Sequence, residues 1–296
     1  MNENKLVSYC ILSYNQEKYI KFCLESVLSQ SYGNLEIIIS DDFSTDDTWS
    51  IIQNTLNEYK GNHIIKIFRN EKNLGLAVHY SKVIYEIASG EYIIFLGGDD
   101  ICKSDHVAIA MSYVCKFPDT MLFDFSGEII DDKGCFVKKI DVAHKLKKYY
   151  LNDYLEMNSV NSFAPGRVFN RNLIDIFAPI NANCPTEDSV MVLRSLLTGG
   201  FLRIDENLIY YRIHDHNISS NAGLKSMNNE AIINQYLTDI TFLFSKGDLK
   251  IDIYHRIIFR IIFELKFRNL IKETSKVKRQ INSWYYLVLY KLLRYF

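Results

Sequence analysis

Apolar residues follow two alternating spacings along the first hundred positions of the chain. Short apolar-rich runs cover 6–12, 35–40, 64–70 and 92–96, and each has the length of a buried strand. Between these runs, apolar residues recur every three or four positions over 15–30, 48–59 and 75–89, which is the spacing of amphipathic helices. The alternation predicts strand–helix units with right-handed crossovers and a parallel sheet covered by helices on both faces.

The ends of these predicted helices carry polar and glycine residues of the expected kinds. Ser13 with Gln16, and Ser44 with Asp47, have the spacing of capping boxes, so we expect them to open the first and second helices. Gly90 follows the third helical segment and is expected to close that helix, because glycine readily takes the left-handed conformation there.

A polar cluster follows each of the four predicted strands. The clusters read SYNQE (13–17), DDFST (41–45), RNEKNLG (69–75) and GGDD (97–100). Ligands bind at the carboxyl ends of the strands in parallel sheets, so these clusters should meet at one edge. The two aspartates of the last cluster either point into water at a turn or hold a cation.

The second half of the chain is less regular. It predicts two strands around a turn at 131–134, a short strand and helix within 161–174, and a helix over 184–200 with acids in its first turn. Residues 201–213 fit either a strand pair or one long bent strand. From about residue 228 the pattern is helical, and residues 246–296 contain twelve Lys or Arg against four Asp or Glu.

Composition narrows the class of protein. The formal net charge is −1, so no global field selects nucleic acid as a partner. The six cysteines form no CxxC pair, which favours reduced thiols in a cytosolic protein. The first residues contain too short an apolar run for a signal peptide, and no apolar run is long enough to span a bilayer. We therefore expect a cytoplasmic protein.

Five segments in order give the sequence a family resemblance. Residues 7–48, 69–84 and 90–100, then PTED (185–188) and YRIHDHNIS (211–219), resemble the family-2 glycosyltransferases of bacterial surface-polysaccharide type. The resemblance implies a GT-A fold, an α/β Rossmann-like arrangement with a mostly parallel sheet. It also implies a catalytic domain over 1–222, with a nucleotide-sugar half (1–102) and an acceptor half (103–222). Residues 223–296 would form a C-terminal helical appendage.

The resemblance also assigns roles to particular residues. Asp99 matches a position that holds a divalent metal, Mn²⁺ or Mg²⁺. His214 matches a histidine that reaches either the metal or the diphosphate, and Arg212 could also meet phosphate. Asp188 matches the general base that deprotonates the acceptor, with Glu187 as the alternative. Acids in a first turn also stabilise a helix without any catalytic role. The positions that would line the nucleotide-sugar site are Ser13, Tyr14, Glu17, Asp41, Asp42, Asn73, Gly75, Gly98, Asp99 and Asp100.

The implied activity is metal-dependent transfer, with inversion, from a UDP-hexose or UDP-N-acetylhexosamine to a hydroxyl of a bacterial glycan or lipid-linked oligosaccharide. Gly97 stands where the family has the first acid of its DxD motif, which leaves open a catalytically inactive nucleotide-sugar-binding or scaffolding module. A nucleotidyltransferase would need a Gly-rich basic loop after the first strand, and residues 13–20 are not one.

The basic C-terminal segment leaves three interpretations open. It could contact the inner face of the cytoplasmic membrane peripherally, because basic and aromatic residues beside an aliphatic face suit an interfacial helix near anionic lipid. It could also form a homodimer face or pack onto the catalytic domain.

Overall fold

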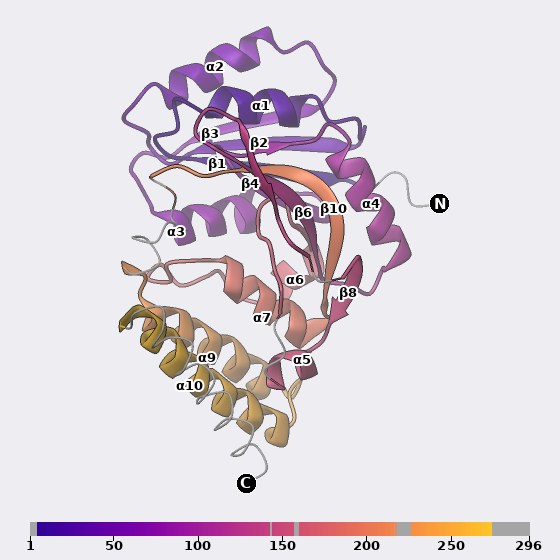
Figure 1. The fold of residues 1–296 in the computed structure, drawn as a ribbon, viewed down its shortest axis with the longest axis vertical. Coiled ribbons are helices and arrows are strands. Elements are labelled where there is room, and N and C mark those ends of the chain that lie inside the picture. Colours follow the sequence, from indigo (N-terminus) through magenta and orange to yellow (C-terminus); the bar gives the residue numbers. More distant parts are fainter. Residues whose placement is uncertain (1–4, 143, 157–159, 216, 218–225, 274–296) are drawn as a thin grey trace.

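Figure 1 shows the computed structural model of the chain, which describes residues 5–142, 144–156, 160–215, 217 and 226–273. Four strands form the first half of one sheet: β1 (Val7–Ser13), β2 (Leu35–Asp41), β3 (Ile64–Arg69) and β4 (Tyr92–Gly97). They are parallel, in the order β3-β2-β1-β4. All residues of β1 and β2 are buried, as the unbroken apolar runs predict, whereas β3 lies at the sheet edge and is mostly exposed.

Helices cover both faces of these strands. α1 (Ile20–Leu28) and α2 (Thr48–Glu58) lie on one face, together with α4 (His106–Lys116). α3 (Leu76–Ser81) lies on the other face and continues into a π-helical segment, η1 (Lys82–Ile87). The predicted strand–helix alternation over the first hundred residues is therefore confirmed.

The predicted capping boxes are wrong. α1 begins only at Ile20 and α2 at Thr48, and neither N-cap residue makes a side-chain capping bond. The hydroxyls of Ser13 and Ser44 instead donate to the carboxylate of Asp41. A buried carboxylate binds a hydroxyl more strongly than a solvated helix end does, so the tertiary contact replaces the local one.

Gly90 does not close the third helix, because that helix ends at Ile87. The backbone N–H of Gly90 donates to Oγ of Ser8 at 2.7 Å. A Cβ atom at this position would lie 2.5 Å from the backbone nitrogen of Ser8, so the glycine is needed for close packing against β1 rather than for a helix cap.

The second half of the sheet mixes strand directions. β6 (Leu122–Ile130) and β10 (Phe201–Arg212) are parallel, while β9 (Val168–Asn170) is antiparallel to both β4 and β6 and joins the two halves. β10 is one long strand with register shifts against β6, which settles the alternative left by its sequence. Three short strands run antiparallel to these two: β5 (Ile101–Cys102), β7 (Phe136–Lys139) and β8 (Leu146–Tyr149).

The remaining helices form a layer below the sheet in Figure 1. They are α5 (Leu151–Leu155), α6 (Arg171–Ile176), α7 (Asp188–Thr198), α9 (Asn229–Lys246) and α10 (Ile251–Glu273). Within the part of the chain that the structure describes, none of the helices is long and apolar enough to cross a membrane. The aromatic-rich segment 283–296 lies outside the described residues.

A buried ion pair fixes α9 against α7. Nε and Nη2 of Arg194 lie 2.7 and 2.9 Å from the two carboxylate oxygens of Asp239, and both side chains are buried. Arg194 also donates to the hydroxyl of Tyr85 at 2.9 Å. α9 therefore packs against the helix that begins at Asp188, and α10 packs against α9 and α5. The contact between α10 and α5 supports the third interpretation for the described part of the basic segment.

Candidate active site

The chain leaves β4 through two glycines beneath α1. The N–H of Gly98 donates to the carbonyl of Leu12 at 3.0 Å. A Cβ atom on Gly98 would lie 2.4 Å from Oε1 of Gln16 and 2.8 Å from Cδ1 of Ile20. A larger residue here would require the side chains of Gln16 and Ile20 to move. The close passage of Gly98 beside them leads the chain to Asp99 at the carboxyl edge of the sheet.

Asp99 meets residues from the segment that follows β10. Its Oδ2 lies 3.0 Å from Nε2 of His214 and accepts a 3.4 Å hydrogen bond from Nδ2 of Asn217. The Asp99 side chain remains 16% exposed and that of His214 9%. Residues 115 positions apart in the chain thus form one polar group at the tip of β4.

Asp100 faces the opposite way, into the protein. Its Oδ1 accepts the backbone N–H of Arg212 at 2.9 Å, and the side chain is buried. Burial, together with the nearby charge of Asp99, raises the pKa of Asp100 well above its usual range. Of the two adjacent aspartates, only Asp99 presents its carboxylate toward solvent.

Arg212 holds this corner together through its guanidinium. Nε donates to the carbonyl of Asp99 at 3.0 Å, and Nη1 donates to the carbonyls of Asp131 and Asp132 at 3.1 and 3.2 Å. The side chain is buried. The sequence leaves open a phosphate contact for Arg212, but these bonds give it a structural role joining β10, the β4 tip and the β6–β7 turn.

Tyr19 was not identified from the sequence. Its ring stacks on the imidazole of His214, with centroids 4.9 Å apart and planes at 25°, and the Arg212 guanidinium lies 5.0 Å from the ring centre. Its hydroxyl donates to the carboxylate of Asp132. Burial and this bond raise the pKa of Tyr19 to about 12. No spacing or motif in the sequence connects these positions.

The carboxylate of Asp41 is fully enclosed at the end of β2. Oδ1 accepts the hydroxyls of Ser13, at 3.3 Å, and of Ser44. Oδ2 accepts the backbone N–H of Ser44 at 2.9 Å and lies 3.4 Å from Nε of Arg69. Asp41 therefore fixes the loops that follow β1, β2 and β3.

Asp42 is enclosed in the same manner. Oδ1 accepts bonds from Nδ2 of Asn70 and N of Leu74 at 2.8 and 2.9 Å, and Oδ2 accepts N of Gly75 at 2.9 Å. Asn73 also accepts the N–H of Gly75, at 2.8 Å. Gly75 has φ +78°, a conformation that favours glycine, so this turn is built around Asp42.

Two residues at these strand ends have strained backbones. Asn15 (φ +52°) and Phe43 (φ +64°) are the only non-glycine residues with positive φ in the part of the chain described. The N–H of Asn15 donates to Oγ of Ser44 at 2.9 Å, and the Arg69 guanidinium lies 5.4 Å from the Phe43 ring centre. Such strain concentrates at functional loops, and both loops border the carboxyl edge of the sheet.

Tyr14 and Glu17 lie on the rim formed by the loop after β1. Tyr14 is 44% exposed. Glu17 binds the start of α2: its N–H donates to Asp46 and its carboxylate accepts the N–H of Asp47, both at 3.1 Å. Tyr14 is therefore available to a ligand, whereas Glu17 joins two loops.

The two candidate bases at the start of α7 have opposite environments. Glu187 is 6% exposed, and burial, with the charge of Asp188, raises its pKa well above the usual range. The Asp188 carboxylate is 47% exposed and lies 3.9 Å from Nη1 of Arg167. Arg167 is itself held by a buried bidentate pair with Asp124 at 2.8 and 3.0 Å. Glu187 is therefore enclosed and has a raised pKa, whereas Asp188 is accessible beside a cation.

A short chain of contacts connects Asp188 to β4. The N–H of Gly166, next to Arg167, donates to the carbonyl of Phe95 at 3.0 Å. Phe95 lies two residues before Gly97 in β4. The start of α7 is thus tied to the strand that carries Asp99.

Metal-ligating groups are sparse in the described ranges. No group of three or more His, Cys, Asp or Glu side chains that could hold an ion occurs among the described residues.

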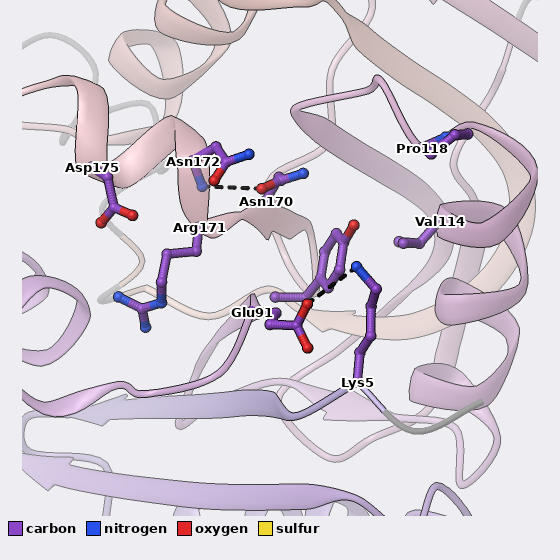
Figure 2. Close-up of a pocket in the computed structure, with 9 residues that line it drawn as sticks. Lys5, Glu91, Val114, Pro118, Asn170, Arg171, Asn172 and Asp175 are labelled. Atoms are coloured by element: carbon purple, nitrogen blue, oxygen red, sulfur yellow. Dashed lines mark hydrogen bonds and ion pairs between the residues drawn. The ribbon is translucent and has the colours of Figure 1, made fainter. Parts of the chain in front are cut away.

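A pocket with a volume of about 310 Å³ lies at the opposite end of the sheet (Figure 2). Lys5 and Glu91, at the starts of β1 and β4, form an ion pair at 3.1 Å there. Arg171 and Asp175 of α6 line another side. None of the residues expected at the nucleotide site lines this pocket, so it is separate from the candidate site.

Comparisons with known proteins agree with this picture. Residues 8–177 match the profile of a family described as Glycosyl transferase family 2. The chain is 30% identical over 226 residues to the UDP-Glc:alpha-D-GlcNAc-diphosphoundecaprenol beta-1,3-glucosyltransferase WfaP of Escherichia coli, covering 73% of this chain and 81% of that protein.

Two solved structures are similar in fold. TarS of S. aureus (residues 1–349, in complex with UDP-GlcNAc) has a TM-score of 0.66 at 18% identity, covering 90% of this chain and 72% of that chain. The mannosyltransferase PcManGT from Pyrobaculum calidifontis, in complex with GDP-Man and Mn²⁺, has a TM-score of 0.58 at 13% identity, covering 98% and 86%.

Proposed function

The chain belongs to glycosyl transferase family 2 and has a GT-A fold, and we propose that it transfers a sugar, with inversion, from a UDP-sugar to a glycan hydroxyl. The observation that carries the proposal is the meeting of Asp99 and His214 at the tip of β4, 3.0 Å apart and partly exposed. The other residues of the site are arranged around this pair.

The pair fits a divalent cation. Two neighbouring ligands of an octahedral ion with bonds of 2.0–2.1 Å are about 2.9 Å apart, close to the observed 3.0 Å. A carboxylate oxygen suits either Mn²⁺ or Mg²⁺, and a neutral imidazole is a common metal ligand that favours Mn²⁺ over the harder Mg²⁺. When bound, the ion would neutralise the charge that develops on the leaving diphosphate. We propose that Asp99 and His214 hold it, with phosphate oxygens completing its coordination.

The nucleotide would lie along the carboxyl edge of β1, β2 and β4. Because the oxygens of Asp41 and Asp42 are already occupied by hydrogen bonds, we propose that these residues shape the pocket. The exposed ring of Tyr14 offers a surface for the base. Ser13, Glu17, Asn73, Gly75, Gly98 and Asp100 then act by holding the loops in place. WfaP is named for a UDP-Glc donor and TarS was solved with UDP-GlcNAc, which supports a UDP-hexose or UDP-N-acetylhexosamine here.

Asp188 is the proposed general base. Its exposed carboxylate can accept the proton of the acceptor hydroxyl, and the Arg167 guanidinium nearby is a favourable partner for its negative charge. Glu187 is buried, so its carboxyl is less accessible to an acceptor hydroxyl than that of Asp188. We expect Asp188→Asn to lower kcat by about 10²–10⁴-fold while nucleotide binding stays unchanged. A Glu187→Gln variant with an equal or larger loss of kcat would assign the base to Glu187 instead.

The proposed acceptor is a bacterial glycan or a lipid-linked oligosaccharide, as the name of WfaP suggests. Residues 246–296 contain twelve basic and four acidic residues, and this positive charge supports peripheral contact with anionic lipid. Full-length protein should co-sediment with phosphatidylglycerol vesicles and not with phosphatidylcholine vesicles. Equal partitioning to both would remove the membrane contact from the proposal. The expected homodimer, the domain limits at 222/223 and the cytoplasmic location remain predictions.

One observation keeps a second function in view. Gly97 stands where the family has an acid, so the β4 tip has one carboxylate fewer than the family pattern. A module that binds a nucleotide-sugar without transferring it could lack this acid. Metal-dependent hydrolysis of a UDP-sugar in the absence of acceptor discriminates the two: turnover excludes the inactive module.

Thermal unfolding tests the donor and metal assignments together. A ligand that binds only the folded state raises the unfolding midpoint by mass action. We expect UDP with Mn²⁺ to raise the unfolding midpoint. UDP with EDTA should raise the midpoint much less, and so should GDP or dTDP with Mn²⁺. A shift that is equal for all three nucleotides, or that is unaffected by EDTA, would contradict the proposal.

A further inference from the structure

We infer that Tyr19 is a positioning residue that holds His214 in place for metal binding; this inference rests on the proposed function. The two rings stack with centroids 4.9 Å apart at 25°. His214 follows β10, whereas Tyr19 immediately precedes α1. The stack therefore joins two separate elements directly at the proposed metal ligand.

Tyr19 is fixed relative to Asp99 by the helix that it precedes. Its N–H donates to the carbonyl of Gln16 at 2.9 Å. On α1, Sγ of Cys23 lies 3.5 Å from the carbonyl of Gly97, and Ile20 closes the space above Gly98. α1 and the β4 tip thus form one packed unit. Because Tyr19 belongs to this unit and stacks on His214, it fixes the imidazole relative to Asp99.

A second contact restrains the Tyr19 ring from the other side of the site. Its hydroxyl donates to the carboxylate of Asp132 in the β6–β7 turn. Asp131 shapes that turn by accepting the N–H groups of Lys133 and Cys135 at 3.0 and 2.8 Å. The carbonyls of the same turn bind Arg212 at the end of β10, and the Arg212 guanidinium lies over the Tyr19 ring. The β6–β7 turn, the end of β10 and the start of α1 therefore meet at this ring.

The ring and the hydroxyl contribute unequally. An aromatic stack orients a neighbouring ring over a wide contact area, whereas a hydrogen bond to an exposed carboxylate competes with water. Asp132 is exposed. Removing the ring should therefore impair metal binding more than removing the hydroxyl alone.

The test measures Mn²⁺ affinity by electron paramagnetic resonance of full-length protein saturated with UDP. Tyr19→Leu should weaken Mn²⁺ binding about threefold to tenfold, and Tyr19→Phe should stay within about twofold. The affinity for UDP in EDTA should be the same in all three proteins. Tyr113→Leu is the matched control, since Tyr113 also donates its hydroxyl to a carboxylate, Glu206 at 3.0 Å, outside the site loops.

The outcomes separate the inference from the function on which it rests. Unchanged Mn²⁺ affinity in Tyr19→Leu, alongside its loss in Asp99→Asn, overturns the inference alone. Weaker UDP binding in EDTA also overturns it, because Tyr19 would then serve the nucleotide. Wild-type protein with no Asp99-dependent Mn²⁺ binding overturns both. If the leucine variant does not fold, Tyr19→Met carries the test, since a flexible thioether fills the space without a ring.

Discussion

Two pairs of adjacent aspartates lie at the carboxyl ends of the parallel strands β2 and β4, and they differ in what surrounds their oxygens. Asp41 and Asp42, after β2, accept seven contacts from nearby loops and are buried. At the tip of β4, Asp100 is buried likewise, but Asp99 remains partly exposed beside His214.

The difference distinguishes carboxylates that hold loops in place from a carboxylate that can bind a ligand. A carboxylate whose lone pairs are filled by backbone N–H groups and hydroxyls stabilises loops but has little capacity left for a ligand. A carboxylate that shares one oxygen with a histidine and an amide can exchange those contacts for a cation. The first pair therefore builds the edge of the site, and Asp99 acts within it.

The largest expected effect falls on Asp99. Asp99→Asn should lower sugar transfer by about 10²–10⁴-fold, because several kcal/mol of charge stabilisation at the leaving group would be lost. The free energy of unfolding should change by less than about 1 kcal/mol. Steady-state kinetics and urea unfolding measure the two quantities. Full activity in this variant would show that the exposed carboxylate has no catalytic use.

Asp42→Asn should show the reverse pattern. The amide would turn a donor toward N–H groups that now bind a carboxylate, so we expect a loss of about 2–3 kcal/mol in the free energy of unfolding. The Mn²⁺ affinity of the folded variant should remain within about threefold of the wild-type affinity. If stability is unchanged and metal or nucleotide binding fails, Asp42 is a direct ligand contact.

A pH series extends the comparison to Glu36 in β2. Burial opposes its charge, but bonds from Lys66, Ser8 and Ser89 lower the pKa of Glu36 to about 2. A lowered carboxyl pKa stabilises the fold above the unfolded value near 4.5, and this contribution is lost as the pH falls toward 2. We expect Glu36→Gln to remove on the order of 2 kcal/mol of stability at pH 6 and much less at about pH 2.5. An equal deficit at both pH values would contradict the assignment.

Asp100→Asn should have the smallest effect. Burial raises the pKa of Asp100 well above its usual range and so favours its uncharged form. An amide of the same shape can replace that form and still accept the N–H of Arg212. Unfolding stability should change by less than about 1 kcal/mol, and Mn²⁺ affinity should change little. Loss of Mn²⁺ binding as severe as in Asp99→Asn would make Asp100 a ligand as well.

Much of the fold could be predicted from the sequence because its first half consists of regular, locally encoded units. The four parallel strands follow from apolar spacing, the site edge from the polar clusters after those strands, and the helix at Asp188 from the acids in its first turn. The failed capping boxes show the limit: the hydroxyls of Ser13 and Ser44 bind Asp41, a partner that only the assembled sheet brings near.

The contacts that organise the site could not be predicted for the same reason. Tyr19 and Asp132 are 113 positions apart, and their meeting depends on how β6, β7 and α1 close around the sheet. The enclosure of Asp41 and Asp42 likewise depends on loops from three strands. A family resemblance supplies roles for such positions, but only the three-dimensional structure shows which donors already bind each carboxylate oxygen.

The most direct test is a crystal structure with UDP and Mn²⁺, with anomalous diffraction recorded at the manganese edge. We expect an anomalous peak within bonding distance of the Asp99 carboxylate and Nε2 of His214, next to the diphosphate, with Asp41 and Asp42 still bound to their loops. Diphosphate bound without a peak at Asp99, or with the ion on Asp41 or Asp42, would contradict the account.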